Sequence, residues 1–159
     1  MKINKLAGCI LSVFFLLNSA LAADQTSLMI HEAWVNLPPP GTDVTAGYCM
    51  IHNTGSTDAK LVKVSSPDFG RVEMHRSTVV NGVARMIPQD SITVPANSGL
   101  TFKPGDYHLM LFQPRQPLAA GGTVTLSFEF ADSTRINATA TIRQQSGASH
   151  EDHSEHQHH

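Results

Sequence analysis

RVEMHRSTVVNGVARMI, residues 71–87, contains the strongest local structural signal in the chain. An Asn-Gly pair at 81–82, flanked by valines, predicts a two-residue type I′ turn and therefore a β-hairpin. In such a hairpin, Met86 lies opposite Ser77, two residues along the partner strand from His75. Diagonal neighbours of this kind are roughly 7–8 Å apart, within reach of long side chains. The turn alone therefore predicts a histidine and a methionine on one face of a ribbon.

The rest of the chain shows the same β pattern. Short runs rich in Val, Ile, Thr and Phe alternate with Pro, Gly, Asn and Asp, and no long stretch has helical periodicity. This pattern is typical of an all-β sandwich or barrel. The strands expected on either side of the turn are 27–36, 45–53, 60–65, 71–80, 83–87, 91–94, 100–102, 107–112, 123–130 and 135–142.

A second histidine and methionine lie together on the predicted strand 107–112. Strand alternation places His108 and Met110 on one face, and Leu109 and Leu111 on the face that suits the core. Two imidazoles and two thioethers favour Cu(I), because thioethers are soft donors, whereas zinc is more often held by Cys, His or carboxylates. Taken singly, however, a strand methionine is usually core filler. Geometry alone leaves both interpretations open.

The N-terminus has the features of a secretory signal peptide. Two lysines precede an apolar run over 6–17, and small residues follow at 19–22, which predicts cleavage after Ala22 and residues 1–22 as the signal. The run is too short for a membrane anchor, which needs about 20 apolar residues. Cys9 sits in a sequence like a lipoprotein processing box, but it precedes the apolar run, so we expect it to be removed with the signal.

The composition of the remaining chain narrows its function. A net charge of −2 without a basic patch argues against nucleic-acid binding, and no second apolar span is present. Cys49 is the one cysteine after the predicted cleavage point, so no intrachain disulfide is expected. We interpret Cys49 as a small buried hydrophobe. The alternative is a thiol ligand in a second soft-metal site with Met50 or His52.

The C-terminal segment differs in composition from the rest. Residues 144–159 hold no large apolar side chain, so we predict a disordered tail after a β-domain at 23–143. The tail is either an inert solubilising end or a metal-gathering arm. Imidazoles without sulfur suit Cu(II) or Zn(II). The candidate ligands are His150, His153, His156, His158 and His159.

The spacing of the two His/Met pairs resembles a known signature. His75, ten residues, Met86, twenty-one residues and His108-x-Met110 match the periplasmic copper chaperones called PCu(A)C. The resemblance covers residues 30–142. Flanking matches are Ala33-Trp34, Gly47-Tyr48, Asn53-Thr54-Gly55, Glu73-Met74-His75 and Pro104-Gly105.

The resemblance implies a fold, a ligand and a partner. The fold would be a cupredoxin-like Greek-key β-sandwich or barrel that binds one Cu(I) through His75, Met86, His108 and Met110. The protein would be a periplasmic monomer that delivers copper to the dinuclear copper centre of cytochrome c oxidase, alone or with Sco-type thioredoxin-like proteins. Copper storage or detoxification is the alternative. Blue-copper electron transfer would need a cysteine beside two histidines. Nothing resembling a catalytic acid, base or nucleophile accompanies the site, so we do not expect an enzyme.

Overall fold

The computed structural model describes residues 27–144, which form ten β-strands and no helix. All ten predicted strands are present, each with both ends within two residues of the prediction. The predicted signal peptide and residues 145–159 of the predicted tail lie outside the described residues. The strands are β1 (Leu28–Asn36), β2 (Val44–Asn53), β3 (Ala59–Ser65), β4 (Phe69–Val80), β5 (Val83–Pro88), β6 (Ile92–Val94), β7 (Ser98–Phe102), β8 (Tyr107–Pro114), β9 (Thr123–Phe130) and β10 (Arg135–Arg143).

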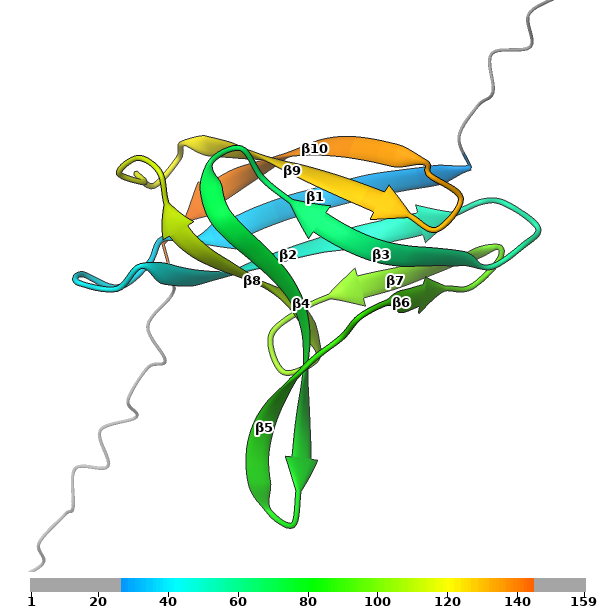
Figure 1. Ribbon diagram of the computed structural model, residues 1–159, viewed down its shortest axis with the longest axis horizontal. Helices are drawn as coiled ribbons and strands as arrows, with labels where there is room; N and C mark the ends of the chain where they lie inside the picture. The colour runs from blue at the N-terminus through cyan, green and yellow to red at the C-terminus, as the bar shows by residue number, and fades with distance from the viewer. Residues whose placement is uncertain (1–26, 145–159) are drawn as a thin grey trace, which may run out of the picture.

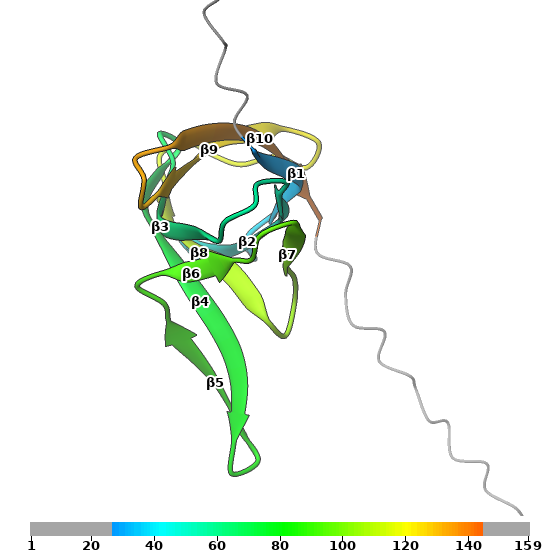
Figure 2. The ribbon, with the colours of Figure 1, turned by 90° about the vertical axis from the view of Figure 1, so that its right-hand side faces the viewer.

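The strands form one rolled sheet in the order β5-β4-β8-β2-β1-β10-β9-β3-β6, with β7 also paired to β2. The β1–β10 pair is parallel, and the other strand pairs of the described chain are antiparallel. Viewed from the side or from the end, the strands surround a central core while the β4–β5 hairpin projects away from it (Figures 1 and 2). The all-β prediction is therefore confirmed. Among residues 27–144, no helix has the length and apolar character to span a membrane.

Strand alternation separates an inner face from an outer face. Along β2, residues 45, 47, 49, 51 and 53 are all buried, whereas Met50 is exposed and His52 is half-buried. Cys49 therefore belongs to the core and points away from Met50 and His52. Burial raises the pKa of the Cys49 thiol to about 12, so the thiol is protonated at neutral pH. These facts confirm Cys49 as a core residue and exclude it from a soft-metal site.

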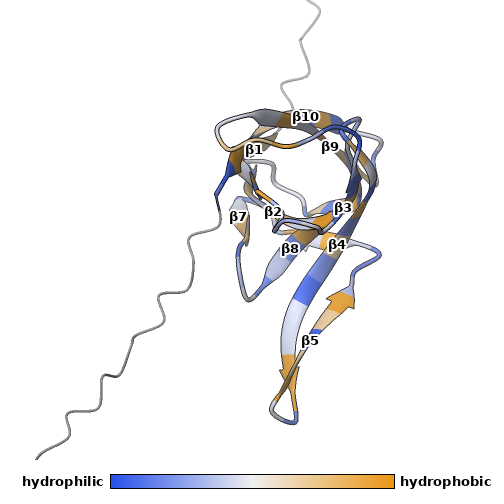
Figure 3. Ribbon diagram, turned by 90° about the vertical axis from the view of Figure 1, so that its left-hand side faces the viewer, coloured by the Kyte–Doolittle hydropathy of each residue, from blue (hydrophilic) through white to orange (hydrophobic). Residues whose placement is uncertain are grey.

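The β4–β5 hairpin has the predicted turn and register. Asn81 and Gly82 have φ values of 52° and 76°, as a type I′ turn requires. Met86 lies opposite Ser77, so His75 and Met86 are diagonal neighbours as expected. Every residue of β5 is exposed, and the hydropathy colouring shows apolar residues near the tip of the hairpin (Figure 3). The hairpin is therefore an arm with solvent on both faces.

Candidate metal centre

Two imidazoles meet where β4 pairs with β8. His75 lies directly opposite His108, and the ring centroids are 5.9 Å apart with 48° between the ring planes. When two imidazole rings each bind the same first-row metal ion through one nitrogen, at the metal–nitrogen bond length of ~2.0 Å typical of zinc, their centroids lie roughly 5–6 Å apart. The separation of these two rings therefore suits a single shared ion.

The two methionines flank this imidazole pair on the same face of the sheet. Met110 lies opposite Glu73 on one side of β4, and Met86 lies opposite Ser77 on the other. Each methionine is thus displaced two residues from His75, in opposite directions along β4. Met110 is half-buried in the body of the domain, whereas Met86 is 62% exposed on the projecting hairpin. Three of the candidate ligands are therefore fixed by the body of the domain, and the fourth is carried by the arm.

His108 is held in one tautomer by the turn that precedes it. Residues 103–106 form a tight turn with Pro104 second and Gly105 third, and Gly105 has a φ of 82°, which is typical of a type II turn. The carbonyl oxygen of Asp106 accepts a hydrogen bond of 2.9 Å from Nδ1 of His108. Because a carbonyl can only accept, Nδ1 carries the proton and Nε2 presents a lone pair. The same carbonyl accepts the backbone N–H of Ser77 at 3.2 Å, which fixes the base of the arm beside the ring.

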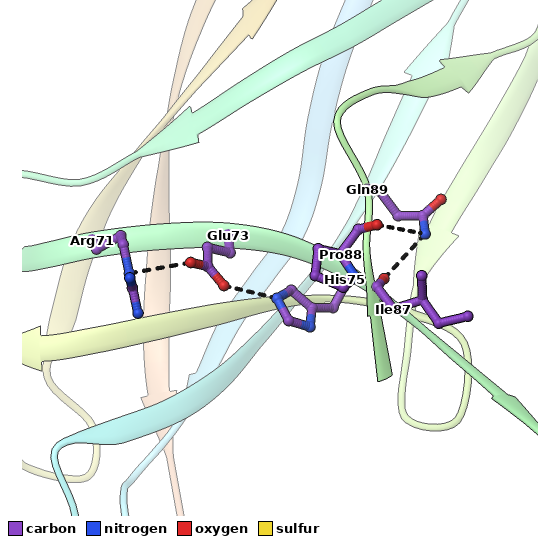
Figure 4. Close-up of polar contacts among 6 residues, drawn as sticks. All are labelled: Arg71, Glu73, His75, Ile87, Pro88 and Gln89. Atoms are coloured by element: carbon purple, nitrogen blue, oxygen red, sulfur yellow. Dashed lines mark hydrogen bonds and ion pairs between the residues drawn. The ribbon is translucent and has the colours of Figure 1, made fainter. Parts of the chain in front are cut away.

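His75 is oriented by a carboxylate on its own strand. Nε2 of His75 donates to Oε2 of Glu73 at 2.9 Å, and Oε1 of Glu73 pairs with Nε of Arg71 at 3.2 Å (Figure 4). A carboxylate accepts and does not donate, so Nε2 carries the proton and Nδ1 presents its lone pair. Carboxylates commonly orient metal-binding histidines in this way. Sequence reasoning missed Glu73, although its position two residues before His75 on one strand face could have revealed it.

Two buried nitrogens lack hydrogen-bond partners in the described part of the chain: Nδ1 of His75 and Nε2 of His108. Buried polar atoms without partners are rare and need an explanation. These are the two lone pairs that the hydrogen bonds to Glu73 and Asp106 leave available. A soft metal fits them, because each is a neutral nitrogen donor on a face that also carries two thioethers. Within residues 27–144, no group of three or more His, Cys, Asp and Glu could hold a metal ion.

The site is not equally deep at all four candidate ligands. His108 is only 4% exposed, whereas Met86 is 62% exposed. The alternation of β8 indicated the face of His108, but it could not show that His75 lies directly opposite on the neighbouring strand. The site is therefore closed at the imidazoles and open at Met86.

The fold and this face define a class of protein, the β-domains that share the PCuAC fold. The copper-bound PCuAC domain from PmoF2 superposes with a TM-score of 0.62 at 21% identity, covering 74% of this chain and 93% of that one. The solution structure of CuI-DR1885 from Deinococcus radiodurans superposes with a TM-score of 0.57 at 27% identity, covering 80% and 84% of the two chains. The predicted cupredoxin-like, PCu(A)C-type fold is thus confirmed.

The chain belongs to the LpqE-like family, whose model, "Putative lipoprotein LpqE-like", matches residues 28–142. It is 30% identical over 122 residues to "Putative lipoprotein Lxx21020" of Leifsonia xyli subsp. xyli, covering 76% of this chain and 72% of the relative. It is 34% identical over 92 residues to "Uncharacterized protein RP573" of Rickettsia prowazekii, covering 57% and 51%. The resemblance expected from the His/Met spacing therefore holds at the level of the family.

Proposed function

We propose that this protein is an exported copper(I) carrier that binds one ion through His75, Met86, His108 and Met110. The observation that carries the proposal is the pair of buried, unpartnered imidazole nitrogens on the face that holds both methionines. The copper-bound PCuAC domain from PmoF2 and CuI-DR1885 share this fold, which supports the same ligand. The predicted signal peptide supports export to the periplasm.

The hydrogen bonds of the site direct one nitrogen of each imidazole away from its partner. In the neutral ring, Glu73 and Asp106 each accept the N–H, so the other nitrogen of His75 and of His108 presents its lone pair to an ion. The thioethers carry no proton, so they bind an ion without releasing one. The negative charge of Glu73 beside the ligands is balanced by Arg71 on its other oxygen, so the surroundings of the site carry little net charge. Such a site would bind a monovalent cation with little electrostatic penalty.

Release to a recipient would begin at Met86. His75, His108 and Met110 belong to the body of the domain, while Met86 is exposed on an arm that has solvent on both faces. An incoming ligand could replace the Met86 thioether while three donors still hold the ion. We propose the copper-bearing subunit of cytochrome c oxidase as the recipient, reached directly or through Sco-type proteins. This transfer is ligand exchange, so the proposed role is carrier and not enzyme.

The ligand set can be tested by X-ray absorption on the full chain loaded with one equivalent of Cu(I). We expect both sulfur and nitrogen scatterers. The Met86→Leu/Met110→Leu double variant should lose the sulfur contribution. A Thr139→Val variant should keep it, because Thr139 is exposed on β10, which pairs only with β1 and β9. A wild-type spectrum with only nitrogen or oxygen ligands would exclude the proposed site.

Delivery and storage can be separated in a strain that lacks the gene. A carrier for the oxidase predicts low oxidase activity at low copper and recovery when copper is added. A storage or detoxification protein predicts normal oxidase activity and sensitivity to high copper. Blue-copper electron transfer is disfavoured because the Cys49 thiol is in the core with its pKa raised to about 12.

The histidine tail is proposed to gather Cu(II) or Zn(II) and to pass copper inward. Truncation should follow Gln144, because Arg143 still pairs with Asn36 in the sheet. Removal of the tail should abolish most Cu(II) binding and leave Cu(I) binding nearly intact. Imidazole has an unperturbed pKa of ~6.5, so Cu(II) binding by the full chain should weaken from about pH 7.5 to about pH 5.5. If Cu(II) binding is unchanged after truncation, the tail does not gather metal and is only a solvated end.

A further inference from the structure

A second set of two histidines and two methionines lies on the outer face of β1 and β2. In this antiparallel pair, Met29 lies opposite His52 and His31 lies opposite Met50. Met29, His31 and Met50 are exposed and His52 is half-buried, while the residues between them point to the core. Each strand contributes a Met-x-His sequence, and the antiparallel pairing sets each imidazole opposite a thioether.

The register brings these four side chains within reach of one ion. Directly opposite residues have Cβ atoms about 4.5–5.5 Å apart, and residues two apart on a strand are separated by roughly 7 Å. The four Cβ atoms therefore form a small rectangle. Both side-chain types extend several ångströms beyond Cβ, so their donor atoms can converge above its centre.

The surroundings keep this rectangle open. Gly99 of β7 lies beside His52, and a Cβ at that position would be 3.4 Å from Nδ1 of His52. Glycine therefore leaves that nitrogen uncovered. At the other end, β1 has a register shift between His31 and Trp34, where Glu32 adopts a positive φ of 50°. Bulges and positive φ at a non-glycine residue cluster at functional sites.

We propose that Met29, His31, Met50 and His52 form a second binding site for Cu(I). Thioether and neutral imidazole donors favour this soft ion. The site is separate from the first, because Met50 is four residues, or roughly 14 Å, along β2 from Ala46, which is the cross-strand partner of Met110. Since its side chains are far more exposed than His108, its affinity is expected to be at least ~10-fold below that of the first site.

The methionine methyl groups provide a direct test. In the full chain, Cu(I) is added anaerobically up to four equivalents while the methyl NMR signals are followed. The first equivalent should shift Met86 and Met110, and later equivalents should shift Met29 and Met50 together. Met74 is in the core and should not move, which checks the fold. If Met29 and Met50 stay unshifted at four equivalents, the second site does not exist.

A single substitution tests whether the four residues act as one site. Met29→Leu should lower the Cu(I) affinity reported by the methyl of Met50 at least tenfold. Thr101→Val, beside Met50 on β7 but without a soft donor, should leave that affinity within twofold. An unchanged Met50 titration in Met29→Leu would overturn the proposal. The first site is judged separately, because unshifted Met86 and Met110 would refute the carrier function without bearing on Met29 and Met50.

Discussion

Glu73→Gln tests whether the carboxylate prepares His75 for the metal. A glutamate accepts only, so it forces the proton onto Nε2 of His75, where the present hydrogen bond measures 2.9 Å. A glutamine can instead donate its amide to Nε2, which moves the proton to Nδ1 and blocks the lone pair. Loss of such an orienting group typically costs 10–100-fold in metal affinity, or about 1.4–2.8 kcal/mol. Because the Glu73 side chain is 34% exposed, we expect the lower end, about tenfold.

The same change should hardly alter stability. The Arg71–Glu73 ion pair is partly exposed, and such pairs contribute below about 1 kcal/mol. Competition with a Cu(I) chelator measures the affinity, and urea unfolding measures the stability. Glu129→Gln is the matched control, because Glu129 also pairs with an arginine at 3.2 Å and its side chain is 33% exposed. Equal copper affinity in the two variants would refute the orienting role of Glu73.

Three further predictions use other parts of the structure. Met110→Leu should cost below about 1.5 kcal/mol of stability but lower Cu(I) affinity sharply in the chelator assay; unchanged affinity would make Met110 a packing residue. Gly47→Ala should destabilise the fold by about 1–3 kcal/mol in urea unfolding, because its Cβ would lie 2.9 Å from Cδ1 of Leu111. Burial raises the pKa of Cys49 to about 12 from the ordinary 9.0, so the folded protein should resist alkylation at pH 8. The stability that depends on the neutral thiol should be complete below about pH 9 and fall between about pH 9 and 12.

Local signals were sufficient to predict the hairpin and the face of β8. The 81–82 turn fixes the register by itself, so Met86 opposite Ser77 followed without knowledge of the remaining fold. The alternation of Leu109 and Leu111 likewise assigned His108 and Met110 to the outer face. Both inferences depend on residues close together in the chain, where turn chemistry and the two-residue period leave little freedom.

The pairing of β4 with β8 could not be predicted in this way. His75 and His108 lie opposite each other, but no short turn joins their two strands and sets the register. The register depends instead on the burial of Met74 and Leu109 in the same core. The hydrogen bonds from His75 to Glu73 and from His108 to Asp106 depend on rotamers that alternation does not determine. The parallel β1–β10 pair joins the two ends of the domain, so it also required the complete fold.

The division of the sheet into two faces explains how one small domain can hold soft-metal donors without weakening itself. The inner face carries the core, including Leu109, Leu111 and Cys49. The outer face carries both His/Met sets, on β4, β5 and β8 for the first and on β1 and β2 for the second. Because the period of a strand is two, an outer donor can be exchanged while its inner neighbours stay packed. Substitution of the exposed donors Met29, Met50 and Met86 should therefore change copper binding with little change in stability. A variant of these residues that lost both together would show that the faces are coupled.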